Sequence, residues 1–437
     1  MTEREKPIVI IGGGFGGLRL ARRLSAYRGA LARPIFLIDQ NEHHVYTPLL
    51  YEVASAWTRS DEDEERLFAK TTFRLSEVVS QYPGVTFLQE RVDAVDCMTK
   101  TVTLSSGKII VADTIVFALG SEPDFFGIPG LEEKALALKT RESARVIRSR
   151  ITAFLEKKRI GKEVDLRVFV GGGGATGVEL AAELAGAFHC LERDGVLGKS
   201  DWSVTLVEAL PRLLGMTTPA VSERAKRRLE SLGIKVHLDT CIKRVENDHV
   251  VLAPRPLREG EKMEQLVCEF RSEFEKTFET DLLIWTGGVR SVSFMKKTGL
   301  LLDRKGRVIV HGGMGIADHP SVYAIGDCAI PTNPITNTPV PLLAQAAISQ
   351  ADIAATQILA DHDVTIQRKV YTFPNFVYAI PLGGKQAIAV IGSTTLTGFL
   401  GWLVRQGSDF LYFLSLFPFP VALRLFFSGM RAYSHND

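Results

Sequence analysis

The sequence predicts an α/β protein with two parallel-sheet units and a separate helical region at its C-terminal end. Two short apolar runs, at residues 7–11 and 166–170, each end in a cluster of glycines, which is typical of buried parallel strands. Beyond about residue 371 the composition changes and becomes rich in Phe, Leu, Gly and Pro. We therefore expect one strand–turn–helix design to be used twice, followed by a region of different character.

The bulk composition is that of a globular chain with several domains. Its 437 residues are enough for two or three domains, and 46% of them are hydrophobic. The 52 basic and 50 acidic side chains give a net charge of +2, so no global field favours a nucleic acid. The five cysteines are scattered without a close pair, which predicts reduced thiols. We find no metal-ligand cluster and no Ser/His/Asp signature in the sequence.

The first unit begins with a βαβ pattern around residues 7–38. Helical periodicity follows from residue 17 to 27, and residues 35–38 form the next apolar run. Gly12, Gly14 and Gly17 occupy the three positions of a G-x-G-x-x-G loop. Such a loop allows a tight turn, close approach of a pyrophosphate to the backbone and close helix–strand packing. Asp39 ends the second strand and is expected to accept the ribose hydroxyls.

The second unit repeats this design around residues 166–208. Gly172, Gly174 and Gly177 have the same spacing, a helix is expected from about Thr176, and Val204–Val207 reads as the next strand. Glu208 follows that strand and would repel a 2′-phosphate, so we expect NADH rather than NADPH, although Arg212 lies nearby in the sequence.

A third motif distinguishes the two units. Residues 321–328 read Ser-Val-Tyr-Ala-Ile-Gly-Asp-Cys, and Thr114–Leu119 is an apolar strand followed by Gly120. Both resemble fingerprints of the two-dinucleotide-binding flavoprotein superfamily, in which the Asp meets the ribityl chain and pyrophosphate of FAD. By that resemblance Asp327 takes this role, the first Rossmann unit binds FAD, and the inserted second unit binds NADH. We expect the FAD domain at 1–125 and 291–370, the NADH domain at 126–290 and a membrane-association region at 371–437.

A more specific resemblance is to the type II NADH dehydrogenases, which are single-subunit NADH:quinone oxidoreductases that pump no protons. It is carried by residues 41–54, Asn-Glu-His-His-Val-Tyr-Thr-Pro-Leu-Leu-Tyr-Glu-Val-Ala, by the second glycine loop with Val-Glu-Leu-Ala after it, and by Trp-Thr-Gly-Gly at 285–288. It spans nearly the whole chain.

The resemblance also implies roles for individual residues. Glu179 would lie near the contact of nicotinamide and flavin and influence charge or proton movement. The alternative for Glu179 is a helix first-turn acid stabilised by the helix dipole. The further residues expected to bind FAD or NADH are Phe15, Pro48, Leu49, Val92, Gly326, Ala175, Thr176 and Gly287.

The quinone-site motif of that family, Ala-Gln-x-Ala-x-Gln, is matched incompletely. Gln345 and Ala347 fit, but the last position is Ser349 and a glutamine follows only at Gln350. A shift of one residue on a helix rotates a side chain by about 100°. We therefore expect a quinone site at Gln345, Ala347 and Ser349, with Gln345 in the catalytic step, and do not expect Gln350 to replace the missing amide.

Two amphipathic helices are expected at the C-terminal end. Arg405, Ser408, Asp409, Tyr412 and Ser415 recur at helical spacing, and after Pro418 and Pro420 a second stripe contains Arg424, Ser428 and Arg431. The uncharged run 410–423 is too short for a span of about 20 residues. We expect these helices to lie in the membrane interface with Trp402 and the arginines at headgroup level. The alternative is a homodimer interface, or core packing against the flavin domains.

Together these features predict an FAD-dependent enzyme that passes electrons from NADH to a membrane quinone. The N-terminal apolar run is too short for a signal peptide, so we expect a peripheral protein on the cytoplasmic face of the cell membrane. Two alternatives remain open: a sulfide:quinone oxidoreductase, which needs paired reactive cysteines at the flavin, and a slow flavin-bound signalling protein.

Overall fold

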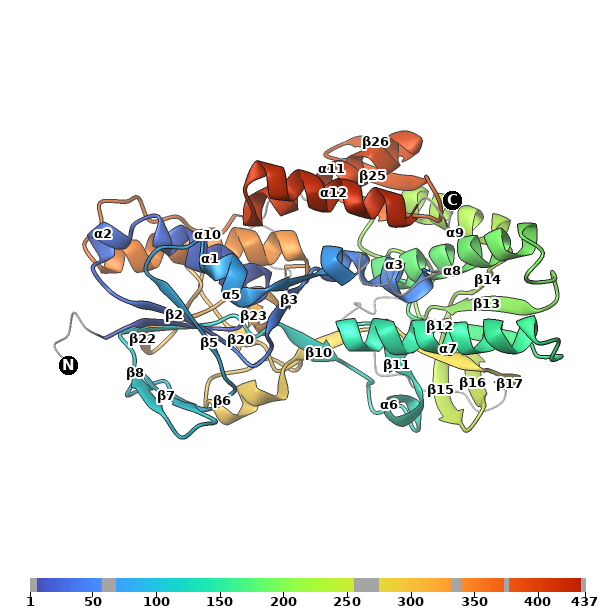
Figure 1. Cartoon of the computed structure of the whole chain (residues 1–437). Coiled ribbons are helices and arrows are strands. Elements are labelled where there is room, and N and C mark those ends of the chain that lie inside the picture. Colours follow the sequence, from blue (N-terminus) through green and yellow to red (C-terminus); the bar gives the residue numbers. More distant parts are fainter. Residues whose placement is uncertain (1–5, 57–67, 255–274, 332–339, 373–376, 434–437) are drawn as a thin grey trace. The chain divides into compact units, whose positions relative to one another are not determined.

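The computed structural model describes residues 6–56, 68–254, 275–331, 340–372 and 377–433, the last six of these by their backbone alone (Figure 1). The chain forms two units. Unit 1 consists of Met1–Val45, Thr72–Glu122 and Val289–Phe376, and unit 2 of Tyr46–Thr71, Pro123–Gly288 and Val377–Asp437. Each unit contains a mainly parallel sheet flanked by helices, which confirms the predicted α/β class.

The sheet of unit 1 has the strand order β21-β22-β9-β1-β2-β5. Its strands are β1 (Ile8–Ile11), β2 (Ile35–Asp39), β5 (Val85–Gln89), β9 (Thr114–Phe117), β21 (Gly315–Ile316) and β22 (His319–Ala324). In register, Ile8 pairs with Ile35 on one side and Thr114 on the other. The four residues of β1 are fully buried, as expected for a central parallel strand that is covered on both faces.

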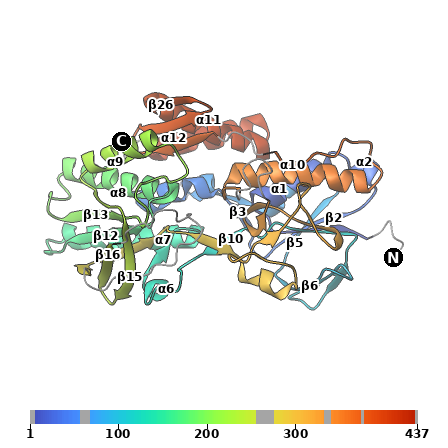
Figure 2. The same ribbon diagram turned by 180° about the vertical axis from the view of Figure 1, so that it is seen from behind.

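Helices cover one face of this sheet and a small antiparallel sheet lies on its other side (Figures 1 and 2). The helices of unit 1 are α1 (Phe15–Ser25), α2 (Arg28–Leu31), α5 (Leu75–Val79) and α10 (Ala344–Asp361). The antiparallel sheet consists of β6 (Val92–Asp96), β7 (Thr101–Leu104) and β8 (Ile109–Val111). Helix α1 begins two residues earlier than predicted because the extended backbone of Gly14 already provides its N-terminal boundary.

Short elements complete unit 1. They are β3 (His43–Val45) paired with β4 (Thr72–Arg74), β20 (Val308–Ile309) paired with β23 (Ala329–Ile330), β10 (Ser121–Pro123) paired with β19 (Val289–Ser291), and the 3-10 turns η5 (Ser293–Lys297) and η6 (Gly326–Cys328). The chain passes between the units after Val45, after Thr71, within β10 after Glu122, just before β19 and after Phe376.

The sheet of unit 2 has the order β11-β18-β12-β13-β14 and repeats the arrangement of unit 1. Its strands are β11 (Leu136–Ala137), β12 (Leu166–Gly171), β13 (Trp202–Val207), β14 (Lys235–His237) and β18 (Leu282–Trp285), all paired in parallel. An antiparallel sheet of β15 (Thr240–Glu246), β16 (His249–Pro254) and β17 (Lys276–Glu279) packs beside it.

The helices of unit 2 include the segment after β3 and the C-terminal region. They are the turn η2 (Thr47–Leu49), α3 (Leu50–Ser55), α6 (Leu131–Lys134), α7 (Arg141–Arg159), α8 (Ala175–Arg193), α9 (Pro219–Ser231), α11 (Phe399–Leu416) and α12 (Phe419–Tyr433). Helix α11 packs on an antiparallel sheet of β24 (Tyr378–Pro381), β25 (Ala387–Ile391) and β26 (Thr394–Gly398).

The contacts place two segments differently from the domain scheme that we predicted. Tyr46–Thr71 and Val377–Asp437 belong to unit 2, whereas we expected the first within the FAD domain and the second as a separate region. The assignment of the domains to FAD and NADH remains a prediction.

Candidate active site

The first glycine loop lies at the carboxyl end of β1. Gly12 has φ +114°, and a Cβ on it would lie 2.3 Å from the carbonyl oxygen of Ala118. A Cβ on Gly17 would lie 1.8 Å from the carbonyl oxygen of Gly12. No described atom outside its chain neighbours comes within 4 Å of a Cβ placed on Gly14. Side chains would thus clash with the backbone at Gly12 and Gly17, whereas no described atom fills the space beside Gly14. A pyrophosphate-binding turn at a helix N-terminus requires this combination.

Two side chains from later elements hold this loop. The Gly13 N–H donates to Asp39 Oδ2 at 2.7 Å, while Asp39 Oδ1 accepts from the backbone N–H of Asn41 at 2.8 Å. His44 Nδ1 lies 3.1 Å from the carbonyl oxygen of Gly13, and its ring packs edge-on against Phe15. Burial lowers the pKa of His44 to about 4, so the ring is neutral and serves as a support of the loop.

The other predicted FAD residues of unit 1 follow neighbouring strands of the same sheet. Gly120 comes after β9, Val92 after β5, and Gly326 with Asp327 after β22. Because these strands are parallel, their carboxyl ends meet at one edge of the sheet together with the first glycine loop. The residues present therefore fit a dinucleotide at this edge.

Asp327 and Gly326 have partners that the sequence did not indicate. The Ser121 hydroxyl donates to Asp327 Oδ2 at 2.6 Å, and the Gly326 N–H donates to Gln350 Oε1 at 2.6 Å. Gln350 is buried and its amide oxygen supports the turn η6. No local sequence signal could have identified Ser121, because 206 residues separate it from Asp327.

The predicted quinone residues lie in the first two turns of α10. Gln345 is exposed, Ser349 is half-buried one turn later, and Ala347 is buried. A Cβ on Gly326 would lie 3.5 Å from the Cβ of Ala347, so Ala347 faces the loop expected to bind FAD. Gln345 and Ser349, four residues apart, lie on one side of the helix.

The second glycine loop has the same backbone features as the first. Gly172 has φ +106°, and a Cβ on it would lie 2.5 Å from the Cα of Gly287. A Cβ on Gly177 would lie 1.9 Å from the Gly172 carbonyl oxygen, while a Cβ on Gly174 meets no described atom within 4 Å. Ala175 and Thr176 form the first turn of α8 directly behind this opening.

The acid after β13 holds the second loop as Asp39 holds the first. The Gly173 N–H donates to Glu208 Oε2 at 2.5 Å, and the Leu210 N–H donates to Oε1 at 2.8 Å. Arg212 donates to the carbonyl oxygens of Thr217 and Gly215 at 2.9 and 2.8 Å. The guanidinium of Arg212 is thus held by backbone carbonyl oxygens. The carboxylate of Glu208 therefore determines the charge at the expected ribose position. The residues present fit a dinucleotide without a 2′-phosphate.

A cluster of charged side chains lies inside unit 2 around Glu179. Its other members are Glu52, Lys70, Arg405 and Asp409. Arg405 pairs with Asp409 on α11, and its Nη2 also donates to the carbonyl oxygen of Pro48 at 2.8 Å. Helix α11 is thereby bound to the turn η2, which contains both Pro48 and Leu49.

Aromatic hydroxyls border the same cluster. The Tyr46 hydroxyl donates to Asp409 Oδ1 at 2.5 Å, and the Tyr46 ring stacks on Tyr412. Burial raises the pKa of Tyr46 and of Tyr51 well above the usual range, with neighbouring carboxylates adding to the effect. Both phenols therefore remain protonated hydrogen-bond donors.

Burial shifts the protonation of two members of this cluster. It raises the pKa of Glu179 to about 8; Arg405 opposes the shift, and Asp409 and Glu52 reinforce it. Burial also lowers the pKa of Lys70 to about 8, against the attraction of Glu52 and Asp409. Near neutral pH Glu179 is therefore a neutral, protonated carboxyl that can release its proton within an accessible pH range.

The expected headgroup position of Arg405 is wrong. Arg405 and Asp409 are 6% and 4% exposed, because the polar stripe of α11 faces the protein. The outer side of this helix instead carries Phe399, Leu400, Leu403 and Leu411, which are 46–67% exposed. Of the second stripe, Arg424 is exposed, while the side chains of Ser428 and Arg431 lie outside the described residues.

The described cysteines do not form a disulfide, and Cys268 lies outside the described residues. Cys328 is buried next to Asp327, and its thiol donates to the carbonyl oxygens of Phe117 and Ile325. Burial raises the pKa of Cys328 to about 11, which keeps the thiol protonated and unreactive.

Comparison with known proteins identifies the family of this architecture. Residues 6–351 match the family model described as pyridine nucleotide-disulphide oxidoreductase. The chain is 29% identical to the type II NADH:quinone oxidoreductase NdhA of Mycobacterium tuberculosis, over 91% of this chain and 81% of that protein. It is likewise 29% identical to a type II NADH:quinone oxidoreductase of Staphylococcus epidermidis, over 82% and 83% of the two chains. These relatives confirm the resemblance seen in the sequence.

Solved structures share the fold over nearly the whole length. NDH2 of Plasmodium falciparum, solved in complex with NADH, has a TM-score of 0.79 at 17% identity and covers 98% of each chain. The sulfide:quinone oxidoreductase of Aquifex aeolicus has a TM-score of 0.74 at 19% identity and covers 94% of this chain and 90% of that one. At these identities the likeness concerns the fold.

Proposed function

The chain belongs to the pyridine nucleotide-disulphide oxidoreductase family, and we propose that it is an FAD-dependent NADH:quinone oxidoreductase. The observation that carries this proposal is the pair of glycine loops. Each has an open central glycine and an acid bound to the loop, and unit 1 alone adds the Gly326–Asp327 turn. Relatives that match most of the chain are named for the same reaction.

The residues of unit 1 hold FAD in this proposal. The loop Gly12–Gly17 binds the pyrophosphate at the N-terminus of α1, Asp39 binds the ribose, and Asp327 is fixed by Ser121 for contact with the ribityl chain. FAD, once bound, supplies the centre that accepts a hydride and returns electrons one or two at a time.

The residues of unit 2 hold NADH and manage protons. The loop Gly172–Gly177 binds the pyrophosphate, and Glu208 accepts the ribose hydroxyls and disfavours NADPH. Glu179 stores a proton at neutral pH and can give it up when negative charge develops nearby. Pro48 and Leu49 are held by Arg405 through the Pro48 carbonyl, which fixes the turn expected beside the flavin.

The acceptor in this proposal is a quinone bound near Gln345. The Gln345 amide donates to a quinone oxygen, and Ser349 offers a hydroxyl on the same side of α10 where the family motif has a second amide. A hydroxyl is shorter than a glutamine side chain, so the pocket is expected to accept a bulkier head group.

We further propose that α11 and α12 attach the protein peripherally to the cytoplasmic face of the cell membrane. The exposed Phe and Leu side chains of α11, together with Phe419, Val421 and Phe427 of α12, supply the apolar contact. None of the described helices is both long and apolar enough to cross a bilayer. The alternative occupant of this apolar surface is a second copy of the chain.

Steady-state assays with the purified protein test the proposed reaction. We expect oxidation of NADH to depend on an added quinone, with NADPH a poor substitute. Sulfide in place of NADH tests the main alternative, which the protonated, buried Cys328 disfavours. Rapid reduction of quinone by sulfide, or turnover with NADH too slow to distinguish from buffer, would each refute the proposal.

A further inference from the structure

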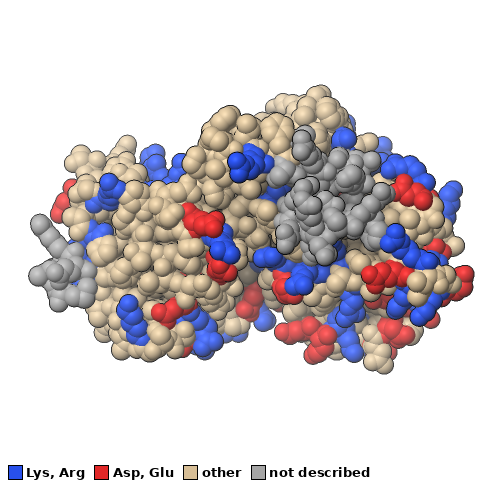
Figure 3. Space-filling model, in the orientation of Figure 1, with Lys and Arg blue, Asp and Glu red and all other residues tan. Residues whose placement is uncertain are grey.

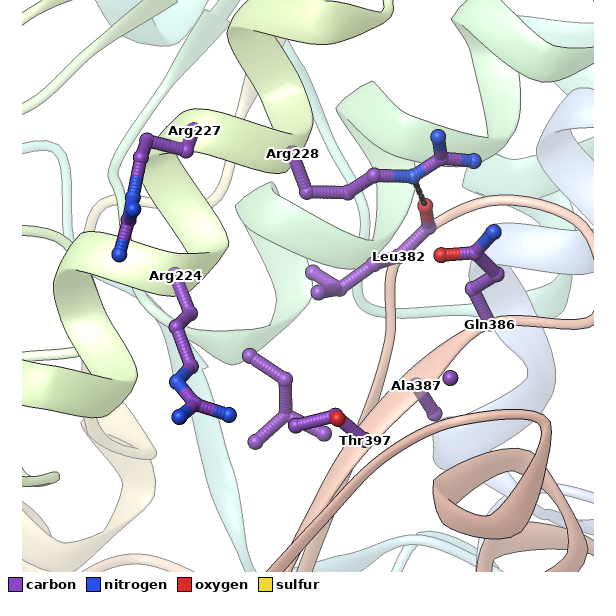
Figure 4. A pocket seen from close by; sticks show the side chains of 9 residues that line it. Arg224, Arg227, Arg228, Leu382, Gln386, Ala387 and Thr397 are labelled. Atoms are coloured by element: carbon purple, nitrogen blue, oxygen red, sulfur yellow. Dashed lines mark hydrogen bonds between the residues drawn. The ribbon is translucent and has the colours of Figure 1, made fainter.

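A basic hollow lies in unit 2 between α9 and the C-terminal sheet (Figure 4). It has a volume of about 570 Å³. Arg224, Arg227 and Arg228 of α9 line one side, and residues of β25 and β26 with the turn before β25 line the other. Arg224 lies three residues before Arg227 and four before Arg228, so side chains from neighbouring turns of α9 border the hollow, and Figure 4 shows their guanidinium groups spread around it.

The positive charge of the hollow is poorly neutralised. No acidic residue lines the described part of the hollow. Arg227 lies 3.5 Å from Glu223, but both side chains are more than half exposed, so that ion pair is weak. Arg228 Nε donates to the carbonyl oxygen of Leu382 at 3.2 Å, which leaves its terminal nitrogens available. Burial lowers the pKa of Arg228, and no carboxylate counters this effect.

The wall of the hollow continues into the exposed apolar side of α11. Thr397 and Gly398 line the hollow, and the next residues, Phe399 and Leu400, are 54% and 58% exposed. Trp402 stacks on Phe399 with ring centroids 5.4 Å apart. Between residues 399 and 433 the sequence has a single acid, Asp409, and it is buried. The surface over α11 and α12 is largely uncharged in the view of Figure 3.

We propose that Arg224, Arg227 and Arg228 form a binding site for the phosphate headgroup of an anionic phospholipid. The site places a phosphodiester where an apolar helix side meets a hollow bordered by three arginines, an arrangement that can bind acyl chains and headgroup together. A soluble phosphate would use the arginines but gain nothing from the adjoining apolar residues. This inference rests on the proposed membrane association of the C-terminal helices and adds to it a preference for acidic lipids.

Vesicle binding by the full-length, FAD-containing protein tests the site. The probes are sedimenting vesicles of phosphatidylcholine alone and of phosphatidylcholine mixed with an equal part of phosphatidylglycerol. We expect the wild type to prefer the mixed vesicles, and this preference to weaken as salt is raised. The R224Q/R227Q variant should bind the mixed vesicles roughly 30-fold more weakly while binding phosphatidylcholine as before.

A matched control removes the same charge elsewhere in unit 2. Arg145 and Arg150 are exposed on α7, and the R145Q/R150Q variant should retain the full preference. Unchanged flavin colour and NADH oxidation with a soluble quinone would show that each variant is folded. An R228Q variant removes a single charge and should bind the mixed vesicles roughly fivefold more weakly.

The remaining outcomes separate the site from the membrane proposal. Equal binding of the wild type to both vesicle types, or unaltered binding by R224Q/R227Q, would overturn the headgroup site and leave membrane attachment standing. Failure of the wild type to bind either vesicle would overturn both. Binding of inorganic phosphate to the wild type but not to R224Q/R227Q, without any effect of phosphatidylglycerol, would identify a soluble phosphate as the occupant and refute the lipid.

Discussion

The glycine loop before α1 and the glycine loop before α8 share one hydrogen-bonding scheme, but the helices after them differ. In each loop the N–H of Gly13 or Gly173 donates to an acid at the end of the next strand, Asp39 or Glu208 respectively. Two residues after the third glycine, however, the first helix has Arg19 and the second has Glu179. Arg19 makes a bidentate ion pair with Asp352 of α10. Glu179 instead lies among the charged side chains of Glu52, Lys70, Arg405 and Asp409, and its pKa is raised.

This difference separates binding from proton chemistry. The shared part of the two loops depends on backbone geometry and holds a pyrophosphate equally well in either unit. The helix after the loop is free to differ, so α1 is tied to a partner helix while α8 presents a protonated carboxyl. The comparison predicts that changes in the loops affect one dinucleotide each, and that changes at the divergent position affect pH dependence in unit 2 alone.

The largest expected effects come from the third glycines. The Cβ in Gly17→Ala would lie 1.8 Å from a carbonyl oxygen, and the Cβ in Gly177→Ala 1.9 Å. We expect Gly17→Ala protein to lose its flavin, and Gly177→Ala protein to stay yellow with the KM for NADH raised about 100-fold, as overpacking of a few kcal/mol implies. Absorbance at purification and steady-state kinetics measure both.

A glycine inside α8 provides the control for this pair. Gly186 has open space where a Cβ would lie, so Gly186→Ala should keep both flavin and NADH affinity. Loss of flavin from the Gly177→Ala protein would contradict the assignment of the loops to different dinucleotides.

Loss of the loop-binding acids should have the next largest effect. Glu208→Gln replaces a charged acceptor of the Gly173 N–H by a neutral one. We expect this change to raise the KM for NADH about 10-fold and to reduce the preference for NADH over NADPH. Asp39→Asn should weaken FAD binding by a similar factor, measured by flavin release on dilution. Glu223→Gln, at an exposed position of α9, should change neither. A Glu208→Gln enzyme with unaltered NADH and NADPH kinetics would show that this carboxylate does not reach the ribose.

Glu179→Gln should change how stability depends on pH. The folded-state pKa of about 8 lies above the ordinary 4.5, so the wild type loses stability as pH rises between these values. The variant lacks this loss, and its melting temperature should exceed that of the wild type by about 2–4 °C above pH 8 and converge with it near pH 5. Calorimetry across pH 5–9 measures the difference. A constant offset across the range would contradict the raised pKa.

The smallest effect is expected at the corresponding position of unit 1. The Arg19–Asp352 pair is about one-third exposed, so Arg19→Gln should lower the melting temperature by about 1 °C or less. No change in the shape of the profile between pH 5 and 8 is expected, because this substitution in unit 1 leaves Glu179 and its charged neighbours in unit 2 unaltered. A pH-dependent change like that of Glu179→Gln would remove the contrast between the two helices.

The parts of this molecule that local pattern determines could be predicted from the sequence. Apolar runs ending in glycines identified β1 and β12. The contacts of Asp39 and Glu208 with the loops were also predictable, because the end of the neighbouring parallel strand lies beside the loop. Contacts between distant segments could not be predicted, such as Ser121 with Asp327 or His44 with Gly13. Periodicity predicted the polar stripe of α11 but not its direction, since an amphipathic helix can turn either side to the protein. Arg405 faces inward because Asp409 and the Pro48 carbonyl satisfy its charge there, and the Tyr46 hydroxyl donates to the same Asp409 carboxylate.

An anaerobic single-turnover experiment tests the proposed electron path most directly. Bound flavin should bleach on addition of NADH, and its colour should return when a quinone is added. Gly177→Ala should slow only the bleaching and Gln345→Ala only the return of colour. Protein that NADH does not bleach, or reduced flavin that no quinone reoxidises, would contradict the account.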